Sequence, residues 1–192
     1  MNIFVLSENY QNAELIEHAI NKSALQNNIT VKHTCFDSTQ IKPCIGCFGC
    51  WIKTPGECVL KDSGRDILKD FIQTDLTIII GSMVFGNYSF PIKTAIDRFI
   101  PNDVFFFTQY KGETHHVKRY ETRPYILFIG IQDELNKAEK DTFLKLCSKN
   151  ATNLCANKHS VLAFHSSDTK ELIEQKVLNT LNAFIANVEV AK

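Results

Sequence analysis

Strand-like and helix-like segments alternate along this chain. The apolar run at residues 76–80 is typical of a central parallel strand buried on both faces. The other strand-like runs lie at residues 2–6, 29–36, 125–131 and 159–164, with stripes of helical spacing between them. This pattern predicts an α/β fold whose helices cover both faces of one parallel sheet. Five strands in 192 residues match a single flavodoxin-like α/β/α sandwich, residues 1–192, with strand order 2-1-3-4-5.

Residues that favour helix starts stand before several of the apolar stripes. Asn12 and Ser63 are expected to cap the first two helices, and Pro91 suits the first turn of the next. Asp168, followed three positions later by Glu171, predicts a capping box at the start of the last helix. These signals support the alternation that the hydrophobic pattern indicates.

Two segments interrupt the alternation. A cysteine-rich loop is expected at about residues 37–62 and a loop excursion at about residues 100–123. Long irregular stretches within a compact domain are usually functional. The second contains Phe105, Phe106 and Phe107, an apolar run that favours self-association as a homodimer or larger homo-oligomer.

The first of these segments carries four closely spaced cysteines: Cys44, Cys47, Cys50 and Cys58. Two-residue gaps let thiolates point at one centre, as in an iron–sulfur cluster such as [4Fe-4S]. A structural zinc site is a second interpretation, and a turn packed by small apolar thiols is a third. Cys35, Cys147 and Cys155 lie in strand and helix patterns and are expected in the core.

Charge and cysteine usage narrow the class of protein. Twenty-one basic and twenty-one acidic residues give no net charge and no basic footprint for nucleic acid or an anionic membrane. No apolar stretch is long enough for a membrane helix, and no nucleophile elbow or Walker-type loop occurs. Seven cysteines without a secretion signal fit a reducing compartment, so a cytoplasmic location is expected.

The loops after the first, third and fourth strands are expected at one sheet edge, where ligands bind in open parallel folds. The first can receive a phosphate at a helix start, with Glu8 turned outward, and the others suit a flat ring. Ordinary capped or strand-to-helix turns are the alternatives. The candidate residues are Ser7, Asn9, Gln11, Asn12, Ser82, Met83, Val84, Phe85, Gly86, Asn87, Tyr88, Ser89 and Gly130.

Three motifs together resemble the cysteine-bearing branch of the NAD(P)H-dependent FMN reductase family, which includes iron–sulfur flavoproteins. They are Cys44-x-x-Cys47-x-x-Cys50 with Cys58, the loop at residues 81–89, and Lys93-x-x-x-Asp97-Arg98. The resemblance implies noncovalent FMN, with its phosphate on the first loop and its ring against residues 82–89. The first loop here lacks the arginine of the family's phosphate loop.

The function expected from this resemblance is an FMN-dependent oxidoreductase that passes hydride or electrons from NAD(P)H to a small-molecule or protein acceptor. Because the redox chemistry belongs to the cofactor, no catalytic side chain is predicted. The alternatives are an electron carrier with a cluster on the four cysteines, and a flavin-free scaffold that uses its thiols or binds zinc. Asp97 and Arg98 are expected to anchor their helix to a neighbouring loop or subunit.

The second interrupting segment also holds a polar and aromatic group. His115 and His116, followed by Arg119 and Tyr120, could meet a nicotinamide, an acceptor or a flavin of a partner subunit. A solvated loop is the alternative, since nothing in the sequence pairs these histidines with a base or a metal ligand.

Overall fold

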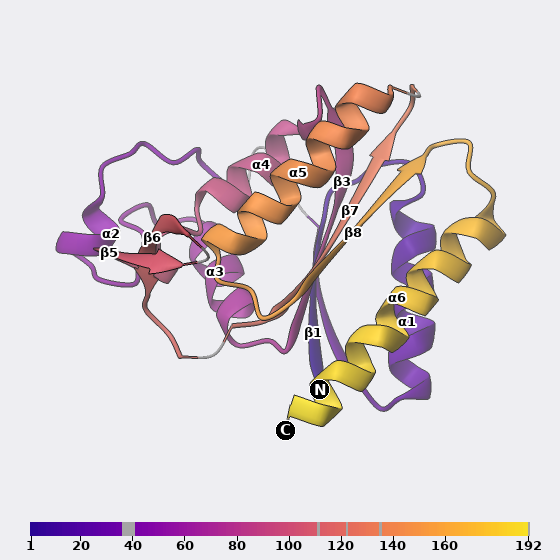
Figure 1. The fold of residues 1–192 in the computed structure, drawn as a ribbon, viewed down its shortest axis with the longest axis horizontal. Helices are drawn as coiled ribbons and strands as arrows, with labels where there is room; N and C mark the ends of the chain where they lie inside the picture. Colours follow the sequence, from indigo (N-terminus) through magenta and orange to yellow (C-terminus); the bar gives the residue numbers. More distant parts are fainter. Residues whose placement is uncertain (36–40, 111, 122, 135, 192) are drawn as a thin grey trace.

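A computed structural model describes residues 1–35, 41–110, 112–121, 123–134 and 136–191 (Figure 1). Five parallel strands form the main sheet in the order β2-β1-β3-β7-β8. Their bounds are β1 Asn2–Ser7, β2 Thr30–Cys35, β3 Leu76–Val84, β7 Tyr125–Gln132 and β8 His159–His165. The predicted flavodoxin-like order 2-1-3-4-5 is therefore confirmed. Residues 36–40, where the second strand was expected to end and the cysteine-rich loop to begin, lie outside the described residues.

Helices cover both faces of the sheet (Figure 1). One layer holds α1 (Ala13–Gln26) and α6 (Lys170–Ala191), and the other holds α3 (Gly64–Ile72), α4 (Phe90–Asp97) and α5 (Lys137–Asn153). Strand β1 serves both layers: Ile3 and Val5 pack toward α1 and α6, whereas Phe4 and Leu6 pack toward the other helices. Alternation along a strand places successive side chains on opposite faces, so each face has its own core.

The helix starts differ from expectation in detail. Asn12 precedes α1 in a left-handed conformation (φ 66°) and caps nothing; its Nδ2 donates to the Ser166 carbonyl oxygen at 2.9 Å. Ser63 also forms no capping hydrogen bond. At α6, Thr169 accepts from the Leu172 amide at 3.3 Å, while Asp168 accepts from the His165 amide. The predicted capping box is therefore wrong, because Asp168 closes the preceding turn instead.

Strand β3 ends four residues later than the apolar run at residues 76–80 predicts. It continues to Val84 and folds back through Phe85 and Gly86 into a short antiparallel strand, β4 (Asn87–Tyr88). Both turn residues have positive φ, at 51° and 74°. The expected loop at residues 81–89 is therefore mostly a hairpin that projects beyond the parallel strands.

The second interruption is also more regular than expected. A 3-10 turn, η1 (Ile100–Asn102), leads into an antiparallel pair, β5 (Asp103–Tyr110) and β6 (Glu113–Lys118), that lies to one side of the main sheet (Figure 1). Gly112, with φ 79°, stands at the turn between the two strands. The expectation of a loop is therefore wrong for residues 103–110 and 113–118. Residues 111 and 122 of that excursion lie outside the described residues.

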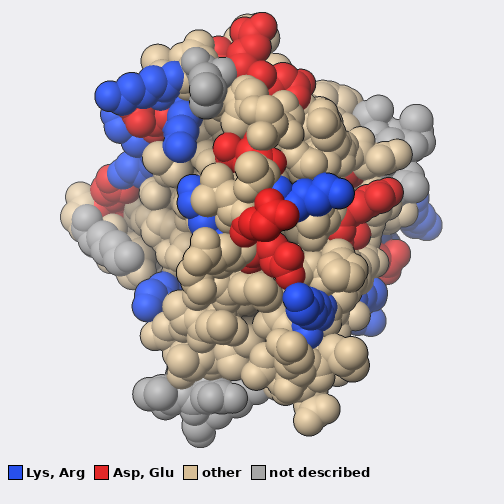
Figure 2. Space-filling model, turned by 90° about the vertical axis from the view of Figure 1, so that its right-hand side faces the viewer, with Lys and Arg blue, Asp and Glu red and all other residues tan. Residues whose placement is uncertain are grey.

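The distribution of charge on the surface and the apolar content of the described helices agree with the composition of the chain. On the face shown in Figure 2, basic and acidic side chains are interspersed, without a broad region of one sign. Within the described ranges, no helix has both the length and the apolar character needed to cross a bilayer.

Candidate functional site

The carboxyl edge of the sheet is organised around a buried glutamate. Glu8 follows β1 directly and is only 8% exposed. Its Oε1 accepts from the Ser82 amide at 2.5 Å and the Ser82 hydroxyl at 2.8 Å, and its Oε2 accepts from the Ser89 hydroxyl at 2.6 Å. Donors of this kind offset the desolvation of a buried carboxylate. An outward turn of Glu8 was the condition for placing a phosphate on this loop, and the structure shows the side chain turned inward toward Ser82 and Ser89.

Two further hydrogen bonds tie the first loop across the same edge. The Tyr10 hydroxyl donates to Asp133 Oδ2 at 2.6 Å, beyond the end of β7, and Asn12 reaches Ser166 beyond the end of β8. Burial, followed by the bond to Asp133, raises the pKa of Tyr10 to about 12. Through these bonds and those of Glu8, the first loop connects the ends of β3, β7 and β8 at the carboxyl edge of the sheet.

Unpaired polar groups remain at this edge. The Ser7 hydroxyl and the Gln132 side-chain oxygen are buried and have no hydrogen-bond partner in the described part of the chain. They stand at the ends of β1 and β7. The start of α1 also lacks a side-chain cap, so its first turn has amides without such a partner. Asn9 and Gln11 are exposed beside it.

The second and third loops mix core residues with exposed ones. Tyr88 is buried, and its hydroxyl lies 3.0 Å from the Ile79 carbonyl oxygen and 3.3 Å from that of Ile129. A Cβ on Gly130 would lie 2.6 Å from the Met83 side chain, so this glycine is needed for packing. Val84 and Phe85 are exposed, and Phe85 at 87% is the most exposed aromatic side chain of the hairpin.

The backbone of Gly86 approaches α5 closely. A Cβ there would lie 2.8 Å from Thr142 Cβ and 3.0 Å from the Glu139 carbonyl oxygen. The approach to α5, together with the positive φ, requires glycine at this position. Asn87 beside it uses its side-chain oxygen to accept from the Tyr88 amide at 2.8 Å.

The four clustered cysteines surround one small cavity. Cys44, Cys47, Cys50 and Cys58 all line a space of about 20 Å³, whose other walls are mainly apolar. Phe48 stands between two of them with φ 51°, an uncommon conformation for a large side chain, and begins the short helix α2 (Gly49–Ile52). Strained backbone of this kind is often found at functional sites.

The arrangement of these thiols is looser than that of a metal centre. Among the described residues, no group of three or more His, Cys, Asp or Glu side chains has an arrangement that could hold a metal ion. Burial raises the pKa of Cys50, and the neighbouring Cys58, Cys44 and Cys47 raise it further. Its neighbours thus oppose the ionisation of Cys50, and a bound cation would reverse that effect.

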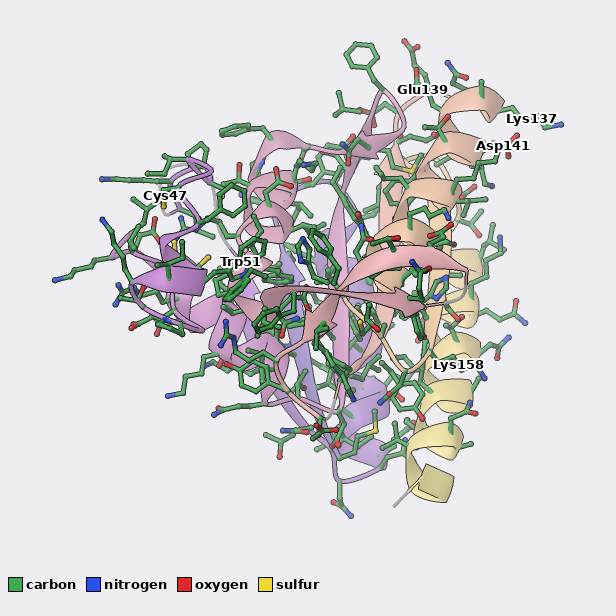
Figure 3. All side chains as sticks on the ribbon, turned by 60° about the vertical axis from the view of Figure 1, so that its left-hand side comes forward. Cys47, Trp51, Lys137, Glu139, Asp141 and Lys158 are labelled. Atoms are coloured by element: carbon green, nitrogen blue, oxygen red, sulfur yellow. The ribbon has the colours of Figure 1, made fainter. Side chains whose placement is uncertain are left out.

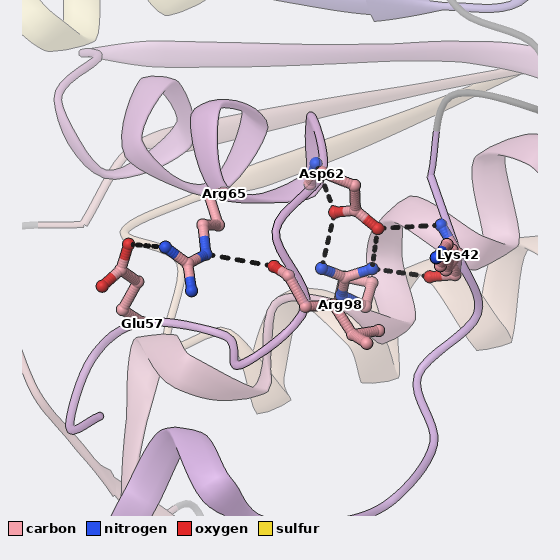
Figure 4. Close-up of polar contacts among 7 residues, drawn as sticks. Lys42, Glu57, Asp62, Arg65 and Arg98 are labelled. Atoms are coloured by element: carbon pink, nitrogen blue, oxygen red, sulfur yellow. Dashed lines mark hydrogen bonds and ion pairs between the residues drawn. The ribbon is translucent and has the colours of Figure 1, made fainter. Parts of the chain in front are cut away.

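The Arg98 side chain joins the two ends of the cysteine-rich loop, at Lys42 and Asp62 (Figure 4). Its guanidinium donates to the Lys42 carbonyl oxygen at 2.6 Å and to both oxygens of Asp62 at 2.9 and 2.8 Å. Although burial acts to lower the pKa of Arg98, Asp62 and Cys58 lie near enough to raise it. The expectation that Arg98 anchors its helix to a loop is confirmed, whereas Asp97 pairs with Lys93 on the same helix.

The remaining cysteines divide into three environments. Cys147 is buried, as expected, and burial raises its pKa to about 12. Cys155 is half-buried, and Cys35 is exposed. The expectation of a core position for Cys35 is wrong because β2 is an edge strand whose side chains are mostly exposed.

The aromatic residues beside the cysteines pack against the hairpin. Trp51 belongs to α2 and its side chain packs toward the β5–β6 strands (Figure 3), where it meets His116. Its Nε1 donates to the Ile100 carbonyl oxygen at 3.2 Å. The His116 ring lies 4.8 Å from Trp51 and 4.7 Å from Phe107, measured between ring centroids. The alternative of a solvated loop is therefore wrong for His116, and Trp51 buries the cysteine segment against the body.

Comparison with known proteins agrees with the resemblance found in the sequence. The chain is 35% identical over 88 residues to an iron–sulfur flavoprotein of Methanocaldococcus jannaschii, which covers 45% of this chain and 44% of that protein. The chain spans less than half the length of the two curated relatives it matches. No family model matches.

Solved structures share the fold over nearly the whole chain. An NAD(P)H:quinone oxidoreductase from Methanothermobacter marburgensis superimposes with a TM-score of 0.66 and 8% identity, covering 93% of this chain and 94% of that one. An FMN-dependent NADH-azoreductase from Bacillus anthracis, in complex with FMN, has a TM-score of 0.61 and 12% identity, with both chains fully covered. Identities this low establish the flavodoxin-like fold alone.

Proposed function

We propose that this protein is an FMN-dependent oxidoreductase that passes hydride or electrons from NAD(P)H to a small acceptor. The observation that carries the proposal is the meeting of three loops at the carboxyl edge of a flavodoxin-like sheet, at the point where strand order reverses. Similarity to an iron–sulfur flavoprotein, together with a shared fold with FMN-dependent reductases, supports it.

The residues at this edge fit FMN in three respects. Two buried polar atoms, Ser7 Oγ and Gln132 Oε1, have no partner among the described residues, and the start of α1 is uncapped. The exposed Phe85 can cover a ring, since aromatic faces pack well on flat heterocycles. Glu8 already accepts hydrogen bonds from Ser82 and Ser89. These serines would therefore hold the first loop against the β3–β4 hairpin instead of contacting the cofactor.

We propose accordingly that the first loop would hold the FMN phosphate and that the β3–β4 hairpin would hold the ring. The residues around the phosphate would be Ser7, Asn9, Gln11 and Asn12, and those of the hairpin would be Met83, Val84, Phe85, Gly86, Asn87 and Tyr88. Ser82 and Ser89 would support the site through Glu8, and Gly130 through its packing against Met83. When bound, FMN supplies the hydride and single-electron chemistry. The chain orients the ring, excludes water and offers main-chain donors, and none of these tasks needs an acidic or basic catalytic side chain.

The test is a titration of the purified protein with FMN, followed by flavin fluorescence. Phe85→Ala is expected to weaken binding about two- to tenfold through loss of ring contact. Phe106→Ala is the matched control, because Phe106 is also an exposed phenylalanine and lies on the β5–β6 hairpin. Addition of NADH or NADPH to the loaded protein should then bleach the flavin. No binding of FMN at any concentration would refute the proposal.

A second candidate function is electron transfer through a cluster on Cys44, Cys47, Cys50 and Cys58. The specific observation in its favour is that the four thiols line one small, mainly apolar cavity, with Arg98 beside Cys58. Soft thiolates suit an iron–sulfur cluster such as [4Fe-4S], and a guanidinium would offset its negative charge. Anaerobic treatment with iron and sulfide, followed by metal analysis, separates this function from zinc binding and from a flavin-free thiol scaffold.

We also propose a reducing, cytoplasmic setting and a homodimer. All seven cysteines are free, which suits a compartment that keeps thiols reduced. Phe105, Phe106 and Phe107 are all exposed on β5 and give an apolar surface that a second copy can cover.

A further inference from the structure

A large cavity lies away from the carboxyl edge. Its volume is about 560 Å³, and its walls come from the cysteine segment, the end of α4, the β5–β6 hairpin and the last turn of α5. Helices between parallel strands run opposite to them, so the ends of α4 and α5 stand toward the other edge of the sheet. We call this space the Trp51 cavity. It is distinct from the proposed FMN site. It adjoins the small cysteine cavity, since Cys44, Gly46, Phe48 and Ile100 line both.

One wall of the Trp51 cavity is a continuous series of rings. Phe48 stacks on Trp51 with 4.9 Å between centroids, Trp51 meets His116 at 4.8 Å, and His116 stacks on Phe107 at 4.7 Å and 28°. Phe107 is nevertheless 69% exposed, although its ring is large and apolar. Such a wall offers flat apolar surface to a flat partner, which gains from offset stacking.

The charges around the cavity select against anions. Asp97 and Asp103 are among its lining residues, and no lysine or arginine is found among the described residues that line it. Lys93 and Arg123 bind these carboxylates from outside that lining. The other polar lining groups are the thiol of Cys44, the imidazoles of His115 and His116, the hydroxyl of Thr114 and the amides of Asn150 and Asn153. A phosphate or carboxylate would therefore find carboxylates, and no lysine or arginine, among the lining side chains.

We infer that the Trp51 cavity is a binding site for an uncharged, planar aromatic molecule. Its volume lies within the range of small-molecule sites, which combine mostly apolar walls with a few polar groups. The ring wall would take the flat face of the ligand, and Asn150 or Asn153 would pair with a carbonyl or amide at its rim. The inference goes beyond the proposed redox function, and its test needs neither flavin nor metal, so the two can fail separately.

The sequence supplies a built-in reporter for the test. Trp51 is the only tryptophan in the chain, so a ¹⁵N-labelled sample gives one indole N–H signal from the wall of the cavity. The probes are naphthalene-2-carboxamide, which is neutral, and 2-naphthoate, which has the same rings and a negative charge. The amide is expected to shift the Trp51 signal in a saturable manner, with the naphthoate bound roughly tenfold or more weakly.

Variants test the wall and the space separately. Phe107→Ala removes one ring of the wall and is expected to weaken amide binding about two- to tenfold. Asn153→Phe places a bulky ring in the cavity from the exposed end of α5 and is expected to abolish binding. Phe106→Ala is the matched control and should bind as the wild type does, because its side chain is outside the lining.

Three results would overturn the inference. They are an indole signal that the amide does not move, equal binding of the amide and the naphthoate, and undiminished binding by the Asn153→Phe variant. If Phe107→Ala disturbs the hairpin, the Asn153→Phe variant decides, since it leaves the hairpin sequence unchanged.

Discussion

Replacing Asp62 with Asn should destabilise the protein strongly, because Asp62 is the counter-ion of a buried arginine. The Arg98 side chain is 1% exposed and that of Asp62 is 11% exposed. A neutral amide in place of the carboxylate would leave the guanidinium charge without compensation in the interior. Breaking a buried pair by removing one partner costs about 3–5 kcal/mol. For a chain of this size, that corresponds to a decrease of about 6–20 °C in Tm.

The pKa of Asp62 gives a second, independent magnitude. Burial alone would raise this pKa, but the hydrogen bonds from Arg98 and the amides of Lys42 and Gly64 lower it from 3.8 to about 2. A carboxyl group whose pKa is depressed on folding stabilises the protein above its unfolded pKa. The contribution, roughly 2 kcal/mol, is lost as the pH falls from about 4 to about 2.

The assay is urea unfolding of wild type and Asp62→Asn at pH 7, repeated at steps down to the lowest pH at which both remain folded. The difference in free energy of unfolding should be full at pH 7 and shrink below pH 4. Glu57→Gln is the matched control, because the Glu57–Arg65 pair in the same region has side chains 55% and 26% exposed (Figure 4). Such exposed pairs contribute at most about 1 kcal/mol.

Two results would refute this reasoning. One is a loss below about 1 kcal/mol for Asp62→Asn, which would mean that solvent reaches Arg98. The other is a difference between the two proteins that does not change below pH 4. A double variant, Asp62→Asn with Arg98→Met, should recover part of the lost stability, because the uncompensated charge is then removed.

Three further predictions concern packing, thiols and association. Gly86→Ala should lower the free energy of unfolding in urea by roughly 2–4 kcal/mol, because the new Cβ combines a positive φ with close contact to Thr142. Gly112→Ala should lower it by about 1–2 kcal/mol, because a Cβ at Gly112 meets no atom within 4 Å and only the positive φ is unfavourable. Equal losses would contradict the packing argument. Iodoacetamide at pH 8 should label the exposed Cys35, Cys44 and Cys47 in the folded protein. Cys147 should stay unlabelled until the protein unfolds, because burial raises its pKa to about 12. Early labelling of Cys147 in mass spectrometry would contradict its buried position. Phe106→Asp should shift sedimentation toward the monomer, and a wild-type protein that is already monomeric at high concentration would exclude the proposed homodimer.

The hydrophobic pattern predicted most of the fold because the central parallel strands β1, β3 and β7 are buried on both faces. Apolar runs such as residues 76–80 and 125–131 lie in β3 and β7, and the stripe that contains Cys147 faces the core. Pro91 at the start of α4 also agrees with its prediction. Signals of this kind are local, so they can be read without knowing which segments meet.

Features that depend on distant partners could not be predicted in the same way. Glu8 is buried because Ser82 and Ser89, more than seventy positions away, supply its donors. The roles of Arg98 toward Lys42 and Asp62 likewise depend on the folded chain. The β5–β6 hairpin had one available signal in Gly112, a turn residue between two runs rich in β-branched or aromatic residues.

The clamp formed by Arg98 has a consequence for how this protein can change over time. Because one guanidinium grips the chain at Lys42 and again at Asp62, the distance between these two points is fixed from outside the intervening segment. Insertions or deletions between them alter only a closed loop, whose entropy changes slowly, by about 0.6 kcal/mol for each doubling of length. The cysteine-rich segment can therefore change in length wherever its residues do not pack against the body, as Trp51 does, while the sandwich stays the same.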